Sequence, residues 1–273
     1  MKFCAIILNR NLPKITDRLY KNLAKCNKGL DIFVVEASDD KKRFSKYVTW
    51  EANWSGVKKK GARYYRGMNF ALSNLYKEKK FYKYDAYILL ANDSIFFNYK
   101  IIDKLERIFK KHKKIGILSP CSKDWGEYKI LDNKEKIKYF WNIHSSVYVV
   151  RTSFIDQIKN ISNSGYKNFF FDGSNFRGYG LDSEIIMKAY SNNWSAAITK
   201  NILFQEDENL LIKNFEKIKT EEIGVNTKLF IQEGFDWMKK KYGFESKWSM
   251  QMFVKYFYDA FFENNPILDK YKL

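Results

Sequence analysis

The chain has 273 residues, 45% of them hydrophobic and 18% aromatic, which is enough for a sizeable folded core. Charged residues make up 29% of the chain, and no apolar stretch approaches the roughly 20 residues that a membrane-spanning helix needs. The net charge of +18 at pH 7 favours anionic partners, namely nucleic acid, phosphorylated small molecules or an acidic membrane surface. The same charge is equally compatible with a solvated lysine surface in a chain of biased composition.

The start of the chain is predicted to form a buried strand over residues 2–8 (KFCAIIL). This strand meets Asn9, Arg10 and Asn11 without a small-residue cleavage site, so we do not expect a secretory signal peptide. The cysteines are odd in number and show no metal-ligand spacing; they are Cys4, Cys26 and Cys121. A reduced, cytoplasmic setting is therefore expected.

Helix-like and strand-like stretches alternate along the next hundred residues. Apolar residues at helical spacing predict helices over 14–26, 62–78 and 100–112. Apolar runs rich in branched and aromatic residues predict strands over 30–38, 85–93 and 114–120. This order predicts an α/β domain of Rossmann-like type, with a mainly parallel sheet flanked by helices.

The second half of the chain continues this pattern and then changes. Residues 143–160 predict a strand that feeds a helix, and a polar loop then leads into a helix over 182–191. One more strand follows, and from about residue 209 the pattern is mostly helical. We therefore expect two units, a core domain over 1–207 and a helical C-terminal extension over 208–273. The extension is expected to pack on the core or to contact a membrane or partner.

Polar side chains gather where the predicted strands end, which is where open α/β sheets bind their ligands. They comprise Asn9 to Asn11, Glu36 to Asp40 and Asn92 to Ser94, joined by a later loop with Asp172, Arg177, Asp182 and Glu184. Acids at strand ends can bind Mg²⁺ or Mn²⁺, since these cations prefer oxygen ligands and share them with substrate phosphates. A further carboxylate, held apart from the metal, can serve as a general base.

Each of these segments also has a purely structural explanation. Asp39-Asp40 and the Asn92 to Ser94 segment are ordinary turn or helix-capping sequences. Asp182 is a suitable helix N-cap, and Glu184 is favourable in the first turn of the same helix. The functional interpretation therefore depends on the order in which the segments occur.

That order resembles the family 2 glycosyltransferases of the GT-A fold, over roughly residues 2–207. The matching segments are IILNRN, FVVEASDD, RGMNFAL, YILLANDSIFF, NIHSSVYVVRTSFIDQI and FFFDGSNFRGYGLDSEIIMKA. The resemblance implies a GT-A fold in which the fourth segment carries the metal motif and the sixth carries the catalytic acids. The ordered set is more specific than any single segment.

The resemblance also implies a role for individual residues. Asp93 is implied to coordinate a divalent cation, Mn²⁺ or Mg²⁺, that bridges the donor diphosphate. Asp182 is implied as the catalytic base, with Glu184 as the second candidate, and the transfer is expected to invert the anomeric carbon. The residues expected to bind the nucleotide-sugar are Asn9, Arg10, Glu36, Ser38, Arg66, Asn69, Asn92 and Asp93. Arg63 joins Arg66 as a candidate for neutralising phosphate charge.

The sequence departs from the family pattern at several positions. Asn92 stands where an acid often precedes the metal ligand, Glu36 replaces a base-contacting Asp, and Leu181 replaces the usual Glu beside the base. In place of a late metal-binding His the chain offers Gln205, Glu206 and Asp207. These departures leave open whether the metal is required.

Two histidines and one tryptophan have side chains that could serve a site. His112, in a lysine-rich helix end, is predicted to be solvated, and neither His112 nor His144 is expected to bind a metal. Trp125 follows a predicted strand, where it can stack on a sugar ring or pack against the core.

The predicted function is transfer of a sugar from a nucleotide-diphosphate sugar to a hydroxyl of a glycan or lipid-linked acceptor. The expected setting is bacterial surface-polysaccharide assembly in the cytoplasm, with peripheral contact to the inner face of an anionic membrane as an option. One alternative is a basic nucleic-acid-binding protein, although the lysines are scattered and no nucleic-acid motif occurs. The other is a catalytically inactive GT-A scaffold.

Overall fold

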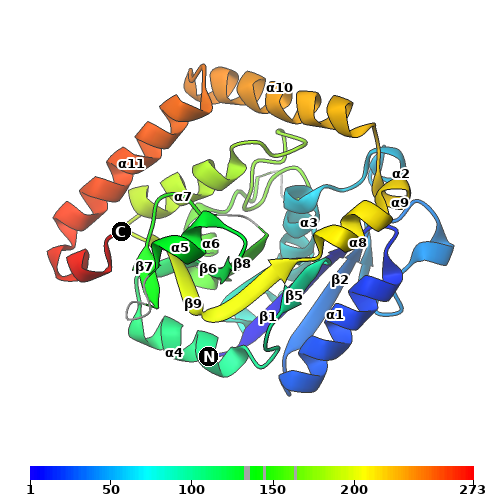
Figure 1. Cartoon of the computed structure of the whole chain (residues 1–273), viewed down its shortest axis with the longest axis horizontal. Coiled ribbons are helices and arrows are strands. Elements are labelled where there is room, and N and C mark those ends of the chain that lie inside the picture. Colours follow the sequence, from blue (N-terminus) through cyan, green and yellow to red (C-terminus); the bar gives the residue numbers. More distant parts are fainter. Residues whose placement is uncertain (132–135, 144–145, 163–164) are drawn as a thin grey trace.

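The computed structural model describes residues 1–131, 136–143, 146–162 and 165–273 (Figure 1). The strands are β1 (Phe3–Asn9), β2 (Asp31–Glu36), β3 (Trp50–Glu51), β4 (Ala86–Ala91), β5 (Ser94–Phe96), β6 (Ile115–Ser122), β7 (Ile137–Tyr139), β8 (Val147–Arg151) and β9 (Ser195–Glu206). They form one sheet in the order β3-β2-β1-β4-β8-β6-β9-β5, with β7 also paired to β9.

The helices lie between these strands and after them. They are α1 (Pro13–Cys26), α2 (Val57–Lys60), α3 (Tyr64–Lys77), α4 (Ile102–Lys111), α5 (Gly126–Ile130), α6 (Thr152–Ile158), α7 (Leu181–Ser191), α8 (Glu208–Lys213), α9 (Phe215–Ile218), α10 (Ile223–Tyr242) and α11 (Lys247–Asn264). Short 3-10 helices are η1 (Lys41–Arg43), η2 (Phe81–Lys83) and η3 (Pro266–Tyr271).

The sheet is mainly parallel, as predicted. β1 pairs in parallel with β2 and β4, β2 with β3, and β6 with β9. Three strands run the other way, because β8 is antiparallel to both β4 and β6, while β5 and β7 are antiparallel to β9. The parallel strands β1, β2 and β4 therefore end at the same edge, which places their polar ends together.

The central strands are apolar because both faces of the sheet are covered. Ile6 and Ile7 of β1 and Leu89 and Leu90 of β4 are fully buried, which is typical of strands with helices on both sides. Helix α3 packs directly on β1. Gly67 permits this close approach, since a Cβ atom there would lie only 2.8 Å from Leu8 Cδ1.

The C-terminal helices α10 and α11 form an arch along one side of the molecule (Figure 1). Helix α11 packs on α7 and buries one face, made of Met250, Val254, Tyr258, Phe261 and Phe262. This face of α11 therefore belongs to the core, while Trp248, Phe253 and Tyr256 of the same helix are exposed. No helix in the described part of the chain is both long and apolar enough to cross a membrane. The division into 1–207 and 208–273 stays a prediction.

The prediction for His112 was wrong. The residue caps the end of α4 and is only 4% exposed. Its ring lies 4.6 Å from the ring of Tyr271, and its Nδ1 lies 3.2 Å from the hydroxyl of Tyr139. The sequence suggested solvation because lysines surround His112, but η3 returns from the C-terminal end to cover it. His144 falls outside the described residues.

Candidate functional site

The ends of β1 and β2 are joined by a buried polar network. Asn9, the last residue of β1, donates from Nδ2 to Glu36 Oε2 at 2.8 Å and to Ser38 Oγ at 3.4 Å. The side chain of Asn9 accepts from the hydroxyl of Thr16 at 2.8 Å. Asn92, after β4, donates to the same hydroxyl at 3.1 Å and to Asn9 Oδ1 at 3.4 Å. Four predicted residues thus meet in a strand-end cluster, comprising Asn9, Glu36, Ser38 and Asn92.

Glu36 is the centre of the strand-end cluster and is fully buried. One carboxylate oxygen accepts the backbone N–H of Ser38 at 2.9 Å, and the other accepts that of Ser45 at 2.8 Å as well as Asn9. These three donors account for both oxygens. In this arrangement Glu36 fixes the loop after β2, and its contact with a nucleotide base stays a prediction that requires these bonds to rearrange.

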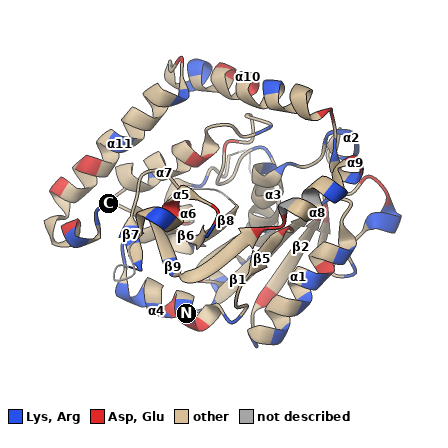
Figure 2. Ribbon diagram, in the orientation of Figure 1, with Lys and Arg blue, Asp and Glu red and all other residues tan. Residues whose placement is uncertain are grey.

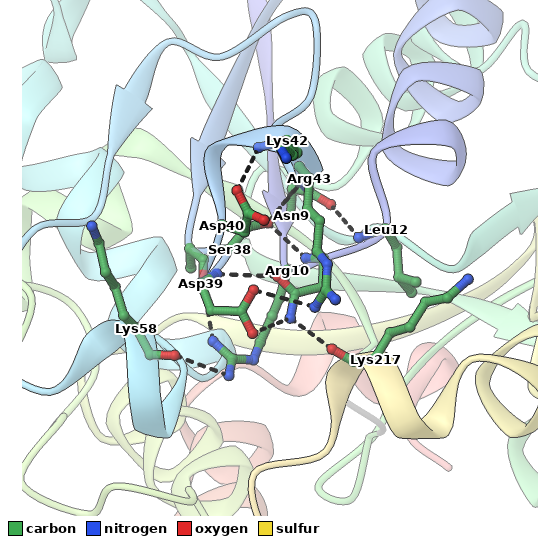
Figure 3. Close-up of polar contacts among 12 residues, drawn as sticks. Asn9, Arg10, Leu12, Ser38, Asp39, Asp40, Lys42, Arg43, Lys58 and Lys217 are labelled. Carbon is green, nitrogen blue, oxygen red and sulfur yellow. Dashed lines mark hydrogen bonds and ion pairs between the residues drawn. The ribbon is translucent and has the colours of Figure 1, made fainter.

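Arg10 and Asn11 contact segments that come later in the chain, and Figure 3 shows Arg10 beside Lys58. Arg10 donates to the carbonyls of Ala37 at 3.0 Å and Lys58 at 3.4 Å, and burial lowers the pKa of its guanidinium. Asn11, with a left-handed φ of 58°, donates to the carbonyl of Lys217 at 2.6 Å. The C-terminal segment therefore touches the predicted donor side of the site.

Asp93 lies in the turn between β4 and β5 and is 7% exposed. Its Oδ1 atom is buried without a hydrogen-bond partner among the described residues. Burial, together with the charge of Glu206, raises the pKa of Asp93 to about 6. The backbone N–H of Asp207 donates to the Asp93 carbonyl at 3.1 Å. An unsatisfied buried carboxylate oxygen is unusual in a folded protein and marks a position that a ligand can complete.

The acids around Asp93 form an acid corner, comprising Asp93, Glu206 and Asp207. Glu206 accepts a short hydrogen bond from the hydroxyl of Ser146. Asp207 accepts the backbone N–H of Leu210 at 3.1 Å, and Arg18 approaches its other oxygen at 3.6 Å. The described residues contain no group of three or more acidic, His or Cys side chains arranged to hold a metal by themselves. Any cation here would take Asp93 Oδ1 as a protein ligand and the rest from substrate or water.

Three guanidinium groups surround one ring and form an arginine cluster, comprising Arg63, Arg66 and Arg177. Their central carbons lie 5.1, 4.6 and 5.4 Å from the ring of Phe176. Arg66 also donates to the carbonyl of Gly173 at 2.7 Å. Burial lowers the pKa of both Arg63 and Arg66. Such a group of buried cations suits an anionic ligand.

The arginine cluster is held by acids from the C-terminal segment. Glu221 accepts from Arg177 at 2.7 Å and from Arg63 at 3.2 Å. Asn226 accepts from the same two arginines at 3.1 and 3.3 Å, and Glu233 forms a further short ion pair with Arg177. The sequence places Arg177 in a polar loop and gives no functional signal at Glu221. No local sequence signal could have revealed this pairing, because Arg63 and Glu221 are 158 residues apart.

Asn69 positions the loop that carries Asp172. The amide oxygen of Asn69 accepts the backbone N–H groups of Phe170 at 3.0 Å and Phe171 at 2.9 Å. Its Nδ2 donates to the carbonyls of Phe171 at 2.7 Å and Tyr166 at 3.3 Å. These four bonds use the full capacity of the side chain, so Asn69 acts on the loop and its direct contact with a donor stays a prediction.

The two candidate bases on α7 differ in availability. Glu184 is 1% exposed, and its Oε1 accepts from both Lys241 and Tyr242 of α10 at 2.6 Å. The side chain of Asp182 is 21% exposed, and among the described residues it has one distant ion pair, with Lys247 at 3.8 Å. The carboxylate of Asp182 is therefore the less engaged of the two, whereas that of Glu184 is held by the C-terminal helices.

Tyr148 of β8 lies close to both Asp182 and the end of β4. The Tyr148 hydroxyl is buried without a hydrogen-bond partner in the described part of the chain. Burial raises its pKa well above the usual value, and the nearby Tyr65 and Asp182 raise it further. Tyr148 pairs with Leu89 of β4, three residues before Asn92. Tyr148 carries no functional signal in the sequence, because its position in the apolar strand β8 is typical of a core residue.

Trp125 packs rather than protrudes. Its ring meets that of Phe204 edge to face, with centroids 5.5 Å apart. Of its two predicted roles, packing is therefore present, and stacking on a sugar stays a prediction.

No protein-family model matches the sequence, and a search of curated proteins found no match. Among solved structures, the mannosyltransferase PcManGT from Pyrobaculum calidifontis, in complex with GDP-Man and Mn²⁺, matches with a TM-score of 0.54 at 10% identity over 95% of this chain and 74% of that one. GalNAc-T7 with UDP, GalNAc and Mn²⁺ gives 0.54 at 9% identity, over 89% and 56%.

A third structure, S. aureus TarS, gives a TM-score of 0.51 at 14% identity, over 88% of this chain and 44% of that one. This chain thus spans less than half the length of TarS. At these low identities the likeness shows the fold, which is the GT-A fold. The predicted fold class is confirmed.

Proposed function

We propose that this protein is an inverting glycosyltransferase of family 2 type, which moves a sugar from a nucleotide-diphosphate sugar to a hydroxyl of a glycan or lipid-linked acceptor. We place it in bacterial surface-polysaccharide assembly on the cytoplasmic side. The observation that carries the proposal is Asp93, a buried carboxylate with an unpartnered oxygen at the end of β4 in a GT-A fold.

The donor side of the proposal is supported by charge. A nucleoside diphosphate carries several negative charges, and its departure develops more negative charge on the leaving oxygen. Arg10, Arg63 and Arg66 come from the strand-end loops and the start of α3, on the edge that also carries Asp93. PcManGT is in complex with GDP-Man and GalNAc-T7 with UDP, which favours a nucleotide-sugar for this chain.

Asp93 can bind a divalent cation, but the remaining ligands of that cation would have to come from substrate or water. Asp93 Oδ1 can supply one oxygen ligand, with Glu206 and Asp207 close by to balance the charge. When bound, Mn²⁺ or Mg²⁺ would neutralise the diphosphate as it leaves. Asn92 contributes an amide instead of a second acid, and its Nδ2 is directed to Asn9 and Thr16.

The acceptor side of the proposal assigns Asp182 as the general base. Its carboxylate is partly exposed and weakly paired, and it lies close enough to Tyr148 to influence the pKa of that hydroxyl. A base that removes the acceptor proton during direct attack gives inversion at the anomeric carbon. Glu184 instead holds α7 to α10 through Lys241 and Tyr242.

A donor screen tests the proposal directly. UDP, GDP and dTDP are titrated into the purified chain with Mn²⁺ by thermal shift, since a ligand that binds the native state raises its stability. Stabilisation by one of them, weakened in Asp93→Asn, is the expected result. Absence of binding by all three to a folded chain would count against the transferase. Binding without donor hydrolysis or transfer would favour an inactive scaffold, and salt-dependent binding of oligonucleotides alone would favour a nucleic-acid-binding protein.

The proposed site of action includes peripheral contact with an anionic membrane through α11. Trp248, Met252 and Tyr256 recur every four residues along one face of α11 and are 72%, 62% and 66% exposed. Trp and Tyr suit the interface between headgroups and acyl chains. Replacing Trp248 and Met252 by Ser should reduce co-sedimentation with phosphatidylglycerol vesicles, whereas Ile267→Ser, on η3, should not. Equal binding by all variants would remove the contact.

A further inference from the structure

A cavity lies outside the candidate site. It has a volume of about 800 Å³ and is bounded by α4, the start of β7, the middle of β9 and η3. In Figure 1, α4 and β7 lie toward the end of the molecule opposite α8 and α9. None of the residues predicted to bind donor, metal or acceptor lines it. Its volume falls in the range of small-molecule sites.

The cavity is strongly basic, and we name it the basic cavity. Six cationic side chains line it: Lys104, Arg107, Lys111, Lys136, Lys200 and Lys270. None of the described lining residues is acidic. Figure 2 shows Lys and Arg residues along α4 and beside β7, in the same part of the fold. Without a counter-ion, these positive charges repel one another across the cavity.

The arrangement on α4 is asymmetric. Lys104, Arg107 and Lys111 follow three- and four-residue spacing, so they share the helix face that borders the cavity. The acids of α4 are engaged elsewhere: Asp103 pairs with Lys100 at 3.4 Å, and Glu106 pairs with Lys110 and with the N-terminus of the chain.

The contacts of the lining cations leave their charge in place. Lys104 donates to the carbonyl of Asn201 at 3.0 Å. Lys200 donates to the carbonyl of Leu131 and lies 4.3 Å from the ring centre of Tyr128. These neutral partners orient the ammonium groups but do not neutralise them. In the described part of the chain, the remaining lining cations likewise form no ion pair with a carboxylate.

The positive charges around the basic cavity affect the pKa of His112 in its buried wall. His112 lines the cavity beside Tyr271, and its imidazole is in contact with Tyr139. Burial, together with the charges of Lys111 and Lys270, lowers the pKa of His112 to about 4. The imidazole therefore stays neutral at pH 7 and provides, with Ile108 and Tyr271, a less polar floor below the cations.

We propose that the basic cavity binds a ligand carrying two or more phosphate groups. One phosphate is satisfied by two or three cationic donors, so six cations around one cavity exceed what a single phosphate uses. Lysine binds phosphate as a point charge without a fixed geometry, which suits a ligand with several equivalent oxygens. A soluble oligophosphate and a phosphorylated lipid headgroup share this chemistry. The proposal does not depend on the proposed transfer reaction.

Tripolyphosphate is the probe for the soluble source. Its affinity for the full chain is measured by titration calorimetry, and again for Arg107→Gln/Lys111→Gln. The matched control is Lys21→Gln/Lys25→Gln, which removes the same charge from the exposed face of α1. We expect affinity to fall at least about tenfold, or 1.4 kcal/mol, in the cavity variant and to change little in the control. An equal fall in both variants, or no fall in either, would overturn the proposal.

Two further measurements keep the outcome interpretable. Arg107→Lys/Lys111→Arg keeps both positive charges, so it should retain affinity for tripolyphosphate. If this variant loses as much affinity as Arg107→Gln/Lys111→Gln, the loss comes from a damaged fold and not from the missing charge. Phosphatidylcholine vesicles containing phosphatidic acid test the lipid source, and tripolyphosphate should displace the chain from them if the headgroup enters the cavity. Binding to an oligonucleotide that depends on Arg107 and Lys111, without binding to either probe, would overturn the proposal in favour of a nucleic-acid surface.

Discussion

Two regions of the molecule each surround a buried ionisable side chain with groups of its own charge. In the acid corner, burial and the charge of Glu206 raise the pKa of Asp93 to about 6. In the basic cavity, burial and the charges of Lys111 and Lys270 lower the pKa of His112 to about 4. In both regions burial and the neighbouring charges disfavour the ionised form of the side chain. A bound cation would offset the negative charges of the acid corner, and a bound anion would offset the positive charges of the basic cavity.

The strand-end cluster shows what a completed polar region looks like. Glu36 is buried more deeply than Asp93, yet both of its oxygens accept hydrogen bonds. Asp93 Oδ1 accepts none from the described residues. The number of hydrogen bonds that the carboxylate accepts therefore distinguishes an acid that stabilises the fold from an acid that can still bind a ligand. Both kinds occur at strand ends, and the sequence does not distinguish them.

The largest expected effect is the loss of transfer in Asp93→Ala. If the acid corner serves a ligand, removing this carboxylate should lower activity by about a thousandfold or more, equivalent to roughly 4 kcal/mol of transition-state stabilisation. The fold should persist with equal or higher thermal stability, because an unsatisfied buried carboxylate is removed. Activity is followed by nucleotide release from the donor identified in the screen. Asp236→Ala, on the exposed face of α10, is the control, and full activity in Asp93→Ala would remove the role of Asp93.

Glu36→Ala should instead damage the fold. The change leaves the N–H groups of Ser38 and Ser45 and the amide of Asn9 without their acceptor, at a cost of about 3 kcal/mol in the free energy of unfolding. Urea denaturation measures the loss. Glu263→Ala, at an exposed position, should change it by less than about 0.5 kcal/mol. A similarly small change in the free energy of unfolding for Glu36→Ala would show that Glu36 does not stabilise the fold, contrary to its proposed difference from Asp93.

The pH dependence of stability tests the basic cavity. Because the pKa of His112 is about 4 in the folded state and 6.5 in the unfolded state, the unfolded chain takes up its proton first as pH falls. His112 therefore contributes full stability above pH 6.5 and loses it between pH 6.5 and about 4, by at most about 3 kcal/mol. The titratable and charged groups around it are Lys111, Lys270, Tyr139, Tyr271 and Arg151, whose guanidinium donates to the His112 carbonyl at 3.3 Å.

Denaturation of His112→Phe over the same pH range isolates this contribution. The slope between pH 6.5 and 4 should be reduced relative to the parent chain, and saturating tripolyphosphate should also reduce it by offsetting the lysine charges. An unchanged slope in His112→Phe would show that other groups dominate this range.

The smallest expected effect concerns the arginine cluster. Glu221 occupies Arg63 and Arg177 as an internal anion, so it competes with a diphosphate for those side chains. Glu221→Gln should tighten binding of the nucleoside diphosphate by about threefold, a modest gain because partly exposed ion pairs are screened. Glu222→Gln, whose side chain is 71% exposed, is the matched control. Weaker binding in Glu221→Gln would indicate that Glu221 instead orients the arginines for the ligand.

Much of the fold was predictable because hydrophobic periodicity is a local property. The strands β1, β2, β4, β6 and β9 and the helices α1, α3, α4 and α7 lie where their apolar patterns predicted them. The short strands β3, β5 and β7 were not predicted, since two or three residues carry too little pattern. The antiparallel direction of β8 could not be derived either, because it depends on how the chain crosses the sheet.

The candidate site was predictable in position more than in role. Asn9, Glu36 and Asn92 do meet at one edge, because parallel strands end together. The sequence could not show that the side chains of Glu36 and Asn69 form their hydrogen bonds with other groups of the protein. It also could not show the contacts of Glu221 and Tyr148, which depend on long-range packing.

Glu184 has a consequence for how the chain is made. Its carboxylate is buried in α7, but its partners Lys241 and Tyr242 lie 57 and 58 residues later. While the protein is being synthesised, α7 emerges long before those partners, whereas Lys188, one turn along the same helix and 3.3 Å from Glu184 in the folded chain, is present from the start. The set of partners of Glu184 is complete only once α10 has formed, and intermediates that expose this surface are where misfolding during translation is expected to begin.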